Sequence, residues 1–415
     1  MNILKKWQET SLVLRILVGL VIGAVLGIII PGNSTIPILG TIFVGALKGI
    51  APVLVFVLVI SALANASSGI GGRFKVVLLL YLVSTLLAAL VAVSASFLFP
   101  VTMTLATGDV TNAAPNGIGE VIGNLLTNMV TNPVAAIANA NYIGVLFWAV
   151  VLGLALKSFA KDSTLEVLAD FADMVSCAVR WIIQLAPFGI LGLVYDSVST
   201  NGLNIFTDYG RLLLILVGSM LFVALVVDPL IIFVTLHRNP YPLVLTCLKE
   251  SGLTAFFTRS SAANIPVNMQ LCERLGLEQD FYSVSIPLGA TINMDGAAVT
   301  ITVMTLAVAH TLGITVDIPS AILLSVIAAL GACGSSGVAG GSLLLIPMAC
   351  TMFGIGSDIA MQAVAVGFII GVVQDSVETA LNSSGDVMFT ATAEYYEMQK
   401  NGQEVEFFKS GLKKQ

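Results

Sequence analysis

Long apolar runs with few charges constrain this chain more than any other feature. Of its 415 residues, 57% are hydrophobic and 10% are charged, whereas soluble domains carry about 25% charged residues. An α-helix satisfies its own backbone in lipid, and about 20 residues cross the hydrocarbon core. We therefore expect an all-α polytopic membrane protein with eight transmembrane helices, near residues 11–30, 38–66, 75–99, 141–160, 172–198, 208–236, 281–311 and 357–392.

Basic residues gather in every second connection between these windows. The first window follows Lys5 and Lys6, and no small-residue cleavage site precedes Pro31, so it is interpreted as a span rather than a signal peptide. Later basic clusters follow every second window, and no Lys or Arg lies between residues 76 and 156. The positive-inside rule then predicts that both termini are cytoplasmic.

Two further apolar regions, near 242–272 and 318–352, have small and polar centres. If both crossed the membrane, Glu273 and Arg274 would lie outside and the charge asymmetry would weaken. We expect instead two re-entrant helical hairpins whose tips meet near the midplane, each followed by an interrupted span. Such an inverted repeat is typical of secondary transporters, with the site where the repeats meet.

Acidic and polar residues share one face of the last apolar segment: Asp375, Glu378, Thr379, Asn382 and Asp386. No Lys or Arg occurs from residue 275 to 399 to neutralise them locally. Carboxylates at bilayer depth are costly and usually mark a functional site. This face is expected to hold a cation or an ammonium group, although polar contacts between helices would use the same residues.

A second polar interruption reads Asn293-Met-Asp-Gly296. Gly296 would permit unwinding that frees carbonyls, and Asp295 would add a carboxylate, which together suit Na⁺. A kinked helix with a hydrogen-bonded Asp is the alternative. Tyr81, Ser84 and Thr85 form a polar patch that is either a further part of an ion site or ordinary packing.

The hairpin tips carry one basic residue and several small hydroxyl residues. Arg259 is either a gate and counter-ion for Asp375 or Glu378, or a cytoplasmic anchor. Ser260, Ser261, Ser335 and Ser336 supply hydroxyls and small volume at the tips, where half-helix N-termini would present N–H groups to a substrate carboxylate. The alternative is that these serines simply allow close helix packing. Four charged residues near span ends are expected to lie at the interface: Lys48, Arg180, Arg211 and Asp228.

Three motifs resemble the dicarboxylate/amino acid:cation symporter family, which has the glutamate-transporter-like fold. They are Thr258-Arg-Ser-Ser261, the run 287–296 that ends in Asn-Met-Asp-Gly, and the acidic face of the last span. The runs 255–266 and 335–347 are similar to the bacterial serine/threonine:sodium symporter branch. The resemblance implies a homotrimer in the bacterial inner membrane, with lipid around it and an elevator-type alternating-access mechanism.

The resemblance also implies a division of the chain, with the second hairpin as the extracellular gate. In this division the chain consists, in order, of scaffold helices 1 and 2 (1–72), transport-domain helix 3 (73–101), scaffold helices 4 and 5 (102–205), the remaining transport domain (206–395) and a cytoplasmic tail (396–415).

Site roles follow from the resemblance, position by position. Asp375 would bind the substrate amino group, and Thr379 would line the side-chain pocket. Ser260, Ser261 and Asn382 would bind the substrate carboxylate. Val338 and Gly340 of the second tip would also contact the substrate. Na⁺, the co-transported ion, would be held at three sites: Gly289, Asn293, Asn382 and Asp386; Thr291 with Ala332, Cys333 and Ser335; and Tyr81, Ser84, Thr85, Asn293 and Asp295. The number of ions stays open, because this branch is expected to carry Ala more often than Asp at position 295.

Position 378 departs from the acidic amino-acid carriers, which place an arginine there to pair with the substrate's side-chain carboxylate. Glu378 would repel that carboxylate, since two like charges 4 Å apart cost about 4 kcal/mol in a partly buried site. It could instead accept a hydrogen bond from a hydroxyl, or be neutralised by Arg259. Import of serine and threonine is therefore expected, coupled to sodium.

Other functions are less compatible with these patterns. The nearest alternative is a sodium- or proton-coupled carrier of other small neutral amino acids or of dicarboxylates. A channel needs rings of like groups along a pore, and a membrane hydrolase needs a histidine near its serine, which neither His237 nor His310 provides. The net charge of −6 argues against nucleic acid, and scattered cysteines support no metal centre.

Overall fold

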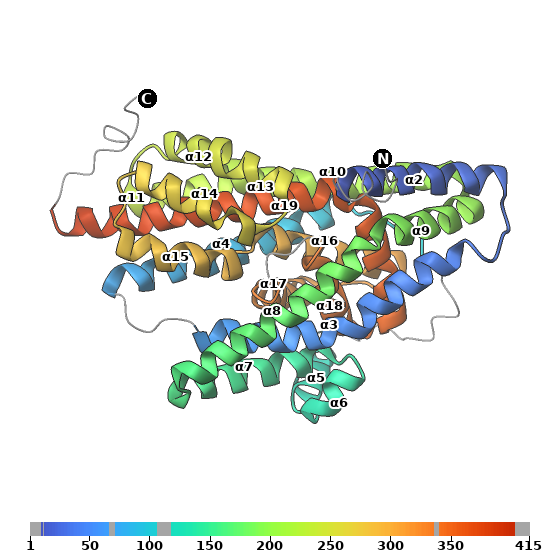
Figure 1. Ribbon diagram of the computed structural model, residues 1–415, viewed down its shortest axis with the longest axis horizontal. Coiled ribbons are helices and arrows are strands. Elements are labelled where there is room, and N and C mark those ends of the chain that lie inside the picture. Colours follow the sequence, from blue (N-terminus) through green and yellow to red (C-terminus); the bar gives the residue numbers. More distant parts are fainter. Residues whose placement is uncertain (1–9, 11, 66–70, 106–117, 336–339, 403–415) are drawn as a thin grey trace, which may run out of the picture.

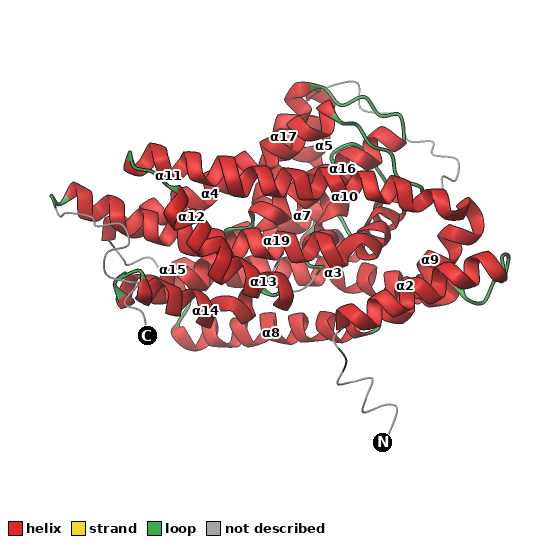
Figure 2. Cartoon of the chain, turned by 90° about the horizontal axis from the view of Figure 1, so that it is seen from above, coloured by secondary structure: helices red, strands yellow, loops and turns green. Residues whose placement is uncertain are grey.

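The computed structural model describes residues 10, 12–65, 71–105, 118–335 and 340–402. Every regular element in this part of the chain is helical (Figures 1 and 2). The expectation of an all-α architecture is therefore confirmed for the described residues.

Six helical segments in the described ranges are long and apolar enough to cross a membrane. They are α3 (Pro37–Asn65), α4 (Gly71–Leu98), α7 (Tyr142–Phe159), the stack of α10 (Ile205–Phe222), η2 (Val223–Val227) and α11 (Asp228–Leu236), the pair α15 (Gln279–Ile292) and α16 (Asp295–Thr311), and α19 (Ser357–Lys400). A bent pair, α8 (Asp162–Gln184) and α9 (Ala186–Asn201), makes seven. The count of eight stays a prediction, because the apolar part of α2 (Leu12–Ile29) is short for a span.

The α8–α9 pair differs from the single span expected at 172–198. The helix begins earlier, at Asp162, and bends by 52° at Leu185. Pro187 follows directly after this point and lies in the first turn of α9. A proline removes a backbone donor and its ring crowds the preceding turn, so it breaks the continuous helix.

The helical segments that follow the two hairpins differ in continuity. The first is interrupted as expected, since α15 ends at Ile292 and α16 begins at Asp295. The second was expected to be interrupted too, but α19 is one unbroken helix of 44 residues. It contains no proline, and its polar residues make side-chain contacts without opening the helix. Gly296 does not unwind α16 either, because it lies within that helix.

Both hairpins are present, and their turns are buried. The first runs through α12 (Tyr241–Cys247), η3 (Leu248–Gly252) and α13 (Leu253–Thr258), then returns as α14 (Ser261–Arg274). The second comprises α17 (Ile318–Ala332), η4 (Ser342–Leu345) and α18 (Ile346–Thr351), and residues 336–339 of its tip lie outside the described residues. Arg259 in the first turn and Ser335 in the second are both buried, as hairpins that end inside the protein require.

The helices pack in two groups. In one, α2 packs on α9, and α3 packs on α7, α8 and α9. In the other, α19 contacts α4, α16 and the first hairpin, while α17 packs on α4 and α16. Figure 1 shows the second group around the long α19, with α7 and α8 crossing below it. Shorter helices complete the fold: α5 (Ile118–Met129), α6 (Pro133–Ala138) and η1 (Gly202–Asn204).

Candidate functional site

Asp375 connects both hairpin tips to α19. Its Oδ2 accepts a hydrogen bond from Arg259 Nε at 2.7 Å, within a buried ion pair, and its Oδ1 accepts one from the backbone N–H of Gly340 at 3.1 Å. Arg259 has φ +53°, a conformation uncommon outside glycine, which lets the turn aim its side chain inward. Of the two interpretations of Arg259, the structure has the counter-ion arrangement and not the cytoplasmic anchor.

Glu378 is held by three protein donors on one oxygen. Its Oε2 accepts hydrogen bonds from Thr300 Oγ1 at 2.6 Å, Ser342 Oγ at 2.8 Å and Gln374 Nε2 at 2.5 Å. These donors come from α16, the second hairpin and α19. The side chain is 5% exposed, and Arg259 pairs with Asp375 rather than with it. Glu378 is therefore stabilised by neutral donors, not by a cation.

These three donors were missed from the sequence. Gln374 precedes Glu378 by one helical turn, a spacing that places both on one face and could have indicated the pair. Thr300 lies one turn after Gly296 in an apolar helix, which was a weaker signal. Gly296 itself allows the close approach of the two helices, since a Cβ there would lie 2.8 Å from the Glu378 Cα.

Asn382 and Thr379 are engaged within the protein. Asn382 Oδ1 accepts a hydrogen bond from the Gly296 N–H at 2.7 Å, so it caps the start of α16. Thr379 Oγ1 donates to the carbonyl of Asp375 at 2.7 Å. Both lie on the face of α19 that carries Asp375, and both are nearly buried.

Asp386, Asn293 and Gly289 form the first oxygen-rich cluster. Asn293 Nδ2 donates to Asp386 Oδ1 at 3.1 Å and to the Asn382 carbonyl at 3.1 Å. A Cβ at Gly289 would lie 2.7 Å from the same Asp386 oxygen, so only glycine fits here. Asp386 Oδ2 has no hydrogen-bond partner among the described residues. The cluster therefore keeps a free, buried carboxylate oxygen.

The predicted patch on α4 meets Asp295, forming the second cluster. Asp295 Oδ1 accepts hydrogen bonds from Ser84 Oγ at 3.0 Å and Thr85 Oγ1 at 2.8 Å. Ser84 Oγ also lies 3.2 Å from Asn293 Oδ1. Tyr81 donates instead to the backbone carbonyls of Ser285 and Asp386. Within the described part of the chain, Asp295 Oδ2 has no partner.

The remaining predicted residues lie apart from these clusters. Thr291 and Ser260 line a cavity of about 750 Å³ together with Arg259 and Cys333, and Ser260 Oγ caps α14 through the Ala263 N–H. Ser261 and Ser335 are buried near the two turns. Val338 lies outside the described residues.

Asp228 is not at an interface, as the sequence suggested. Its side chain is fully buried, whereas Lys48 pairs with Asp358 at the surface and Arg180 and Arg211 are exposed, as expected. The expectation failed because Asp228 lies well inside the helical stack that ends at Leu236.

Comparisons with known proteins identify the family of this chain. The model of the sodium:dicarboxylate symporter family matches residues 12–395. A serine/threonine transporter SstT of Bifidobacterium adolescentis is 61% identical over 97% of this chain and 94% of its own length. Transporters of the same name from Streptococcus agalactiae and Streptococcus thermophilus are 60% and 57% identical, over 94% and 95% of this chain and 97% and 98% of their own lengths.

The match covers the helical groups, both hairpins and the polar clusters on α19, α16 and α4. Identity of this level over nearly the whole length also fits a transporter rather than an enzyme. The chain belongs to the sodium:dicarboxylate symporter family.

Proposed function

We propose that this protein is a sodium-coupled symporter that imports serine and threonine. The names of its relatives support this substrate class. The observation that carries the proposal is the environment of Glu378, which three neutral donors hold on one oxygen. A carboxylate that is hydrogen-bonded only by uncharged donors keeps its negative charge at the side-chain end of the site. It therefore repels an acidic substrate and accepts a hydrogen bond from a hydroxyl.

Substrate binding follows from the contacts of Asp375. The ammonium of the amino acid replaces the Arg259 guanidinium on Asp375, because both are cations that donate to the same carboxylate. Ser260 and Ser261 of the first hairpin, with Asn382, bind the substrate carboxylate. Thr379 and Gly340 of the second tip close the pocket around the side chain.

Sodium binding is supported by the oxygen-rich clusters. In the described structure, Asp386 and Asp295 each keep a buried oxygen without a hydrogen-bond partner, and a bound cation offsets the desolvation of such a carboxylate. Carboxylate, amide and hydroxyl oxygens are suitable ligands for a hard cation. The third predicted site, at Thr291 and Ser335, has fewer ionisable groups.

The movement we propose is an elevator. The packing of α2, α3, α7, α8 and α9 on one another supports a scaffold, and the packing of α4, α16, α17 and the first hairpin around α19 supports a transport domain. The second hairpin would act as the extracellular gate, through its Gly340 and Ser342 contacts with α19. A homotrimer of eight-span subunits with cytoplasmic termini, in the bacterial inner membrane, completes the proposal.

Uptake of labelled serine into proteoliposomes tests the function. With sodium outside, uptake should exceed that with an equal potassium gradient, and unlabelled threonine should compete. Alanine should compete less well because it lacks the hydroxyl. Preferential uptake of aspartate would contradict the substrate class, and uptake driven equally by a proton gradient alone would contradict the coupling ion.

A further inference from the structure

Asp228 is a buried carboxylate that none of the predicted sites uses. It begins α11 directly after the π-helical turn η2, a distortion that is frequent at functional sites. The side chain is 0% exposed, and neither of its oxygens has a hydrogen-bond partner in the described residues. A carboxylate in a dry interior carries a desolvation penalty of several kcal/mol unless something neutralises it.

The carboxylates of Asp228 and Asp295 are both wholly buried, and they belong to α11 and α16, which both pack on α4. Ser84 and Thr85 donate to Asp295 Oδ1, which leaves Oδ2 without a partner in the described structure. The hydroxyl oxygens of Ser84 and Thr85 retain lone pairs that a cation could use.

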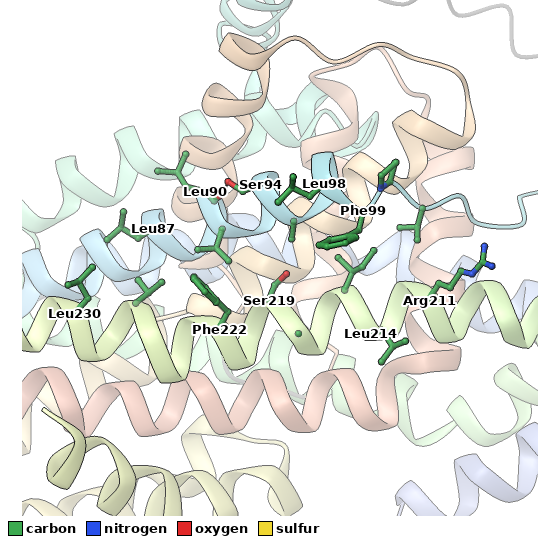
Figure 3. A pocket seen from close by; sticks show the side chains of 17 residues that line it. Leu87, Leu90, Ser94, Leu98, Phe99, Arg211, Leu214, Ser219, Phe222 and Leu230 are labelled. Carbon is green, nitrogen blue, oxygen red and sulfur yellow. Dashed lines mark hydrogen bonds between the residues drawn. The ribbon is translucent and has the colours of Figure 1, made fainter.

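The packing of the helices places these groups in one layer. α4 packs against η2, α11 and α16. Val227 and Leu230, on either side of Asp228, line a groove opposite Leu87 of α4 (Figure 3). Leu87 is less than one helical turn beyond Ser84. Asp228 therefore lies at the level of Ser84 and Thr85, behind an apolar groove.

Among the described residues, no buried cation is left to offset the charge of this pair. The buried side chains in the described ranges include six carboxylates but one cation, Arg259, whose ion pair is with Asp375. Asp228 and Asp295 are thus left without a positive partner. The two carboxylates and the hydroxyls of Ser84 and Thr85 offer only oxygen donors, which suit a hard cation.

We propose that Asp228 and Asp295 bind one Na⁺ between them, with the hydroxyls of Ser84 and Thr85 as neutral ligands. This deepens the proposed function, on which it rests, by adding a carboxylate from α11 to the site predicted at Asp295. The bound ion would tie α11, α4 and α16 together. Sodium affinity at this site then depends on Asp228 as directly as on Asp295.

Asp228→Asn tests the proposal, because the amide has nearly the same shape and no charge. Sodium is titrated against the purified protein without amino acid, and the thermal unfolding midpoint is followed. The sodium concentration for half-maximal stabilisation should rise at least about tenfold, the effect typical of losing a metal-supporting group. Asp208→Asn, a carboxylate in the first turn of α10, is the matched control and should leave the titration unchanged.

Double substitution separates a shared ion from two independent groups. If both carboxylates hold one ion, Asp295→Asn should have little further effect on sodium affinity in the Asp228→Asn background. Fully additive effects, or an Asp228→Asn titration equal to that of the unaltered protein, would overturn the proposal. If the variant does not fold, Asp228→Glu, which keeps the charge but lengthens the side chain, takes its place. A shifted sodium titration supports the proposal, and a titration equal to that of the unaltered protein contradicts it.

Serine uptake distinguishes this inference from the proposed function. Sodium-driven uptake by the unaltered protein together with an unchanged sodium-to-serine ratio in Asp228→Asn would refute only the role of Asp228. Absence of sodium-driven uptake in the unaltered protein would refute the proposed function itself. The ratio is measured from the reversal potential of transport in proteoliposomes and should fall in Asp228→Asn.

Discussion

The two ends of the acidic face of α19 satisfy their carboxylates in opposite ways. Asp375 and Glu378 are each held by two or more protein donors, from both hairpins, α16 and α19 itself. Asp386 keeps an oxygen without a partner in the described structure, as do the neighbouring Asp295 and Asp228. Asp375 and Glu378 must therefore lose a protein hydrogen bond to bind a ligand. Asp386, Asp295 and Asp228 can bind a cation without losing one.

This difference separates the substrate end from the ion end. An ammonium group that arrives at Asp375 competes with Arg259, so its binding is coupled to movement of the first hairpin. A sodium ion at Asp386 competes with nothing that the described residues supply. Ion binding should therefore precede substrate binding and should persist when the substrate end is disabled.

Asp386→Asn should have the largest effect. It removes the charge beside Gly289 and Asn293, and sodium affinity should fall by about 100-fold or more. Sodium-driven serine uptake in proteoliposomes should drop to background. Asp170→Asn, an exposed carboxylate on α8, is the control. If uptake stays within a few-fold of that of the unaltered protein, Asp386 is not a sodium ligand.

Asp375→Asn should come next and should act only on the substrate end. A hydrogen bond to a charged group is worth about 1.5–3 kcal/mol, so the KM for serine should rise about 10- to 100-fold. Sodium binding measured without amino acid should stay unchanged. Loss of sodium binding as well would show that the two ends are not separate.

Glu378→Gln should change selectivity more than rate. Without the negative charge, the preference for serine over aspartate in competition assays should fall at least several-fold, and by up to about 1000-fold if the full repulsion of about 4 kcal/mol is lost. Glu378→Arg should go further, abolishing serine uptake and allowing aspartate to compete. If serine and aspartate compete equally in the unaltered protein and in both variants, Glu378 does not select the substrate. Glu273→Gln, which is exposed, serves as the control.

Thr300→Val should have the smallest effect. It removes one of three donors to Glu378, worth about 1 kcal/mol, so the KM for serine should change about fivefold while maximal uptake is retained. Thr302→Val on the same helix is a matched control, because the Thr302 hydroxyl is buried without a hydrogen-bond partner in the described residues. Equal effects of both variants would indicate general packing of α16 rather than positioning of Glu378.

Local sequence signals predicted the parts of the site that lie within one segment. The acidic face of α19 follows from helical spacing, and the break before Asp295 follows from polar residues in an apolar run. The clustering of Ser84 and Thr85 with Asp295 was raised as one of two interpretations, and their hydrogen bonds form. The identity of these residues as binding groups remains a prediction.

Partners that depend on tertiary packing could not be predicted in the same way. Ser342 reaches Glu378 only because the second hairpin folds back onto α19. The bend at Leu185 had a local cause in Pro187, but a proline can also be accommodated inside an apolar span. Asp228 was expected near a span end although it lies inside the apolar window 208–236, because the sequence does not show which part of so long a window lies at the membrane surface.

The unbroken geometry of α19 fixes the separation between Asp375 and Asp386. At 1.5 Å per residue their Cα atoms lie about 16 Å apart along the axis, and no hinge within the helix can change that distance. α19 therefore acts as a rigid spacer between substrate and ion. Whatever closes or opens the site must be a displacement of the hairpins, α4 or α16 against a helix that keeps its length.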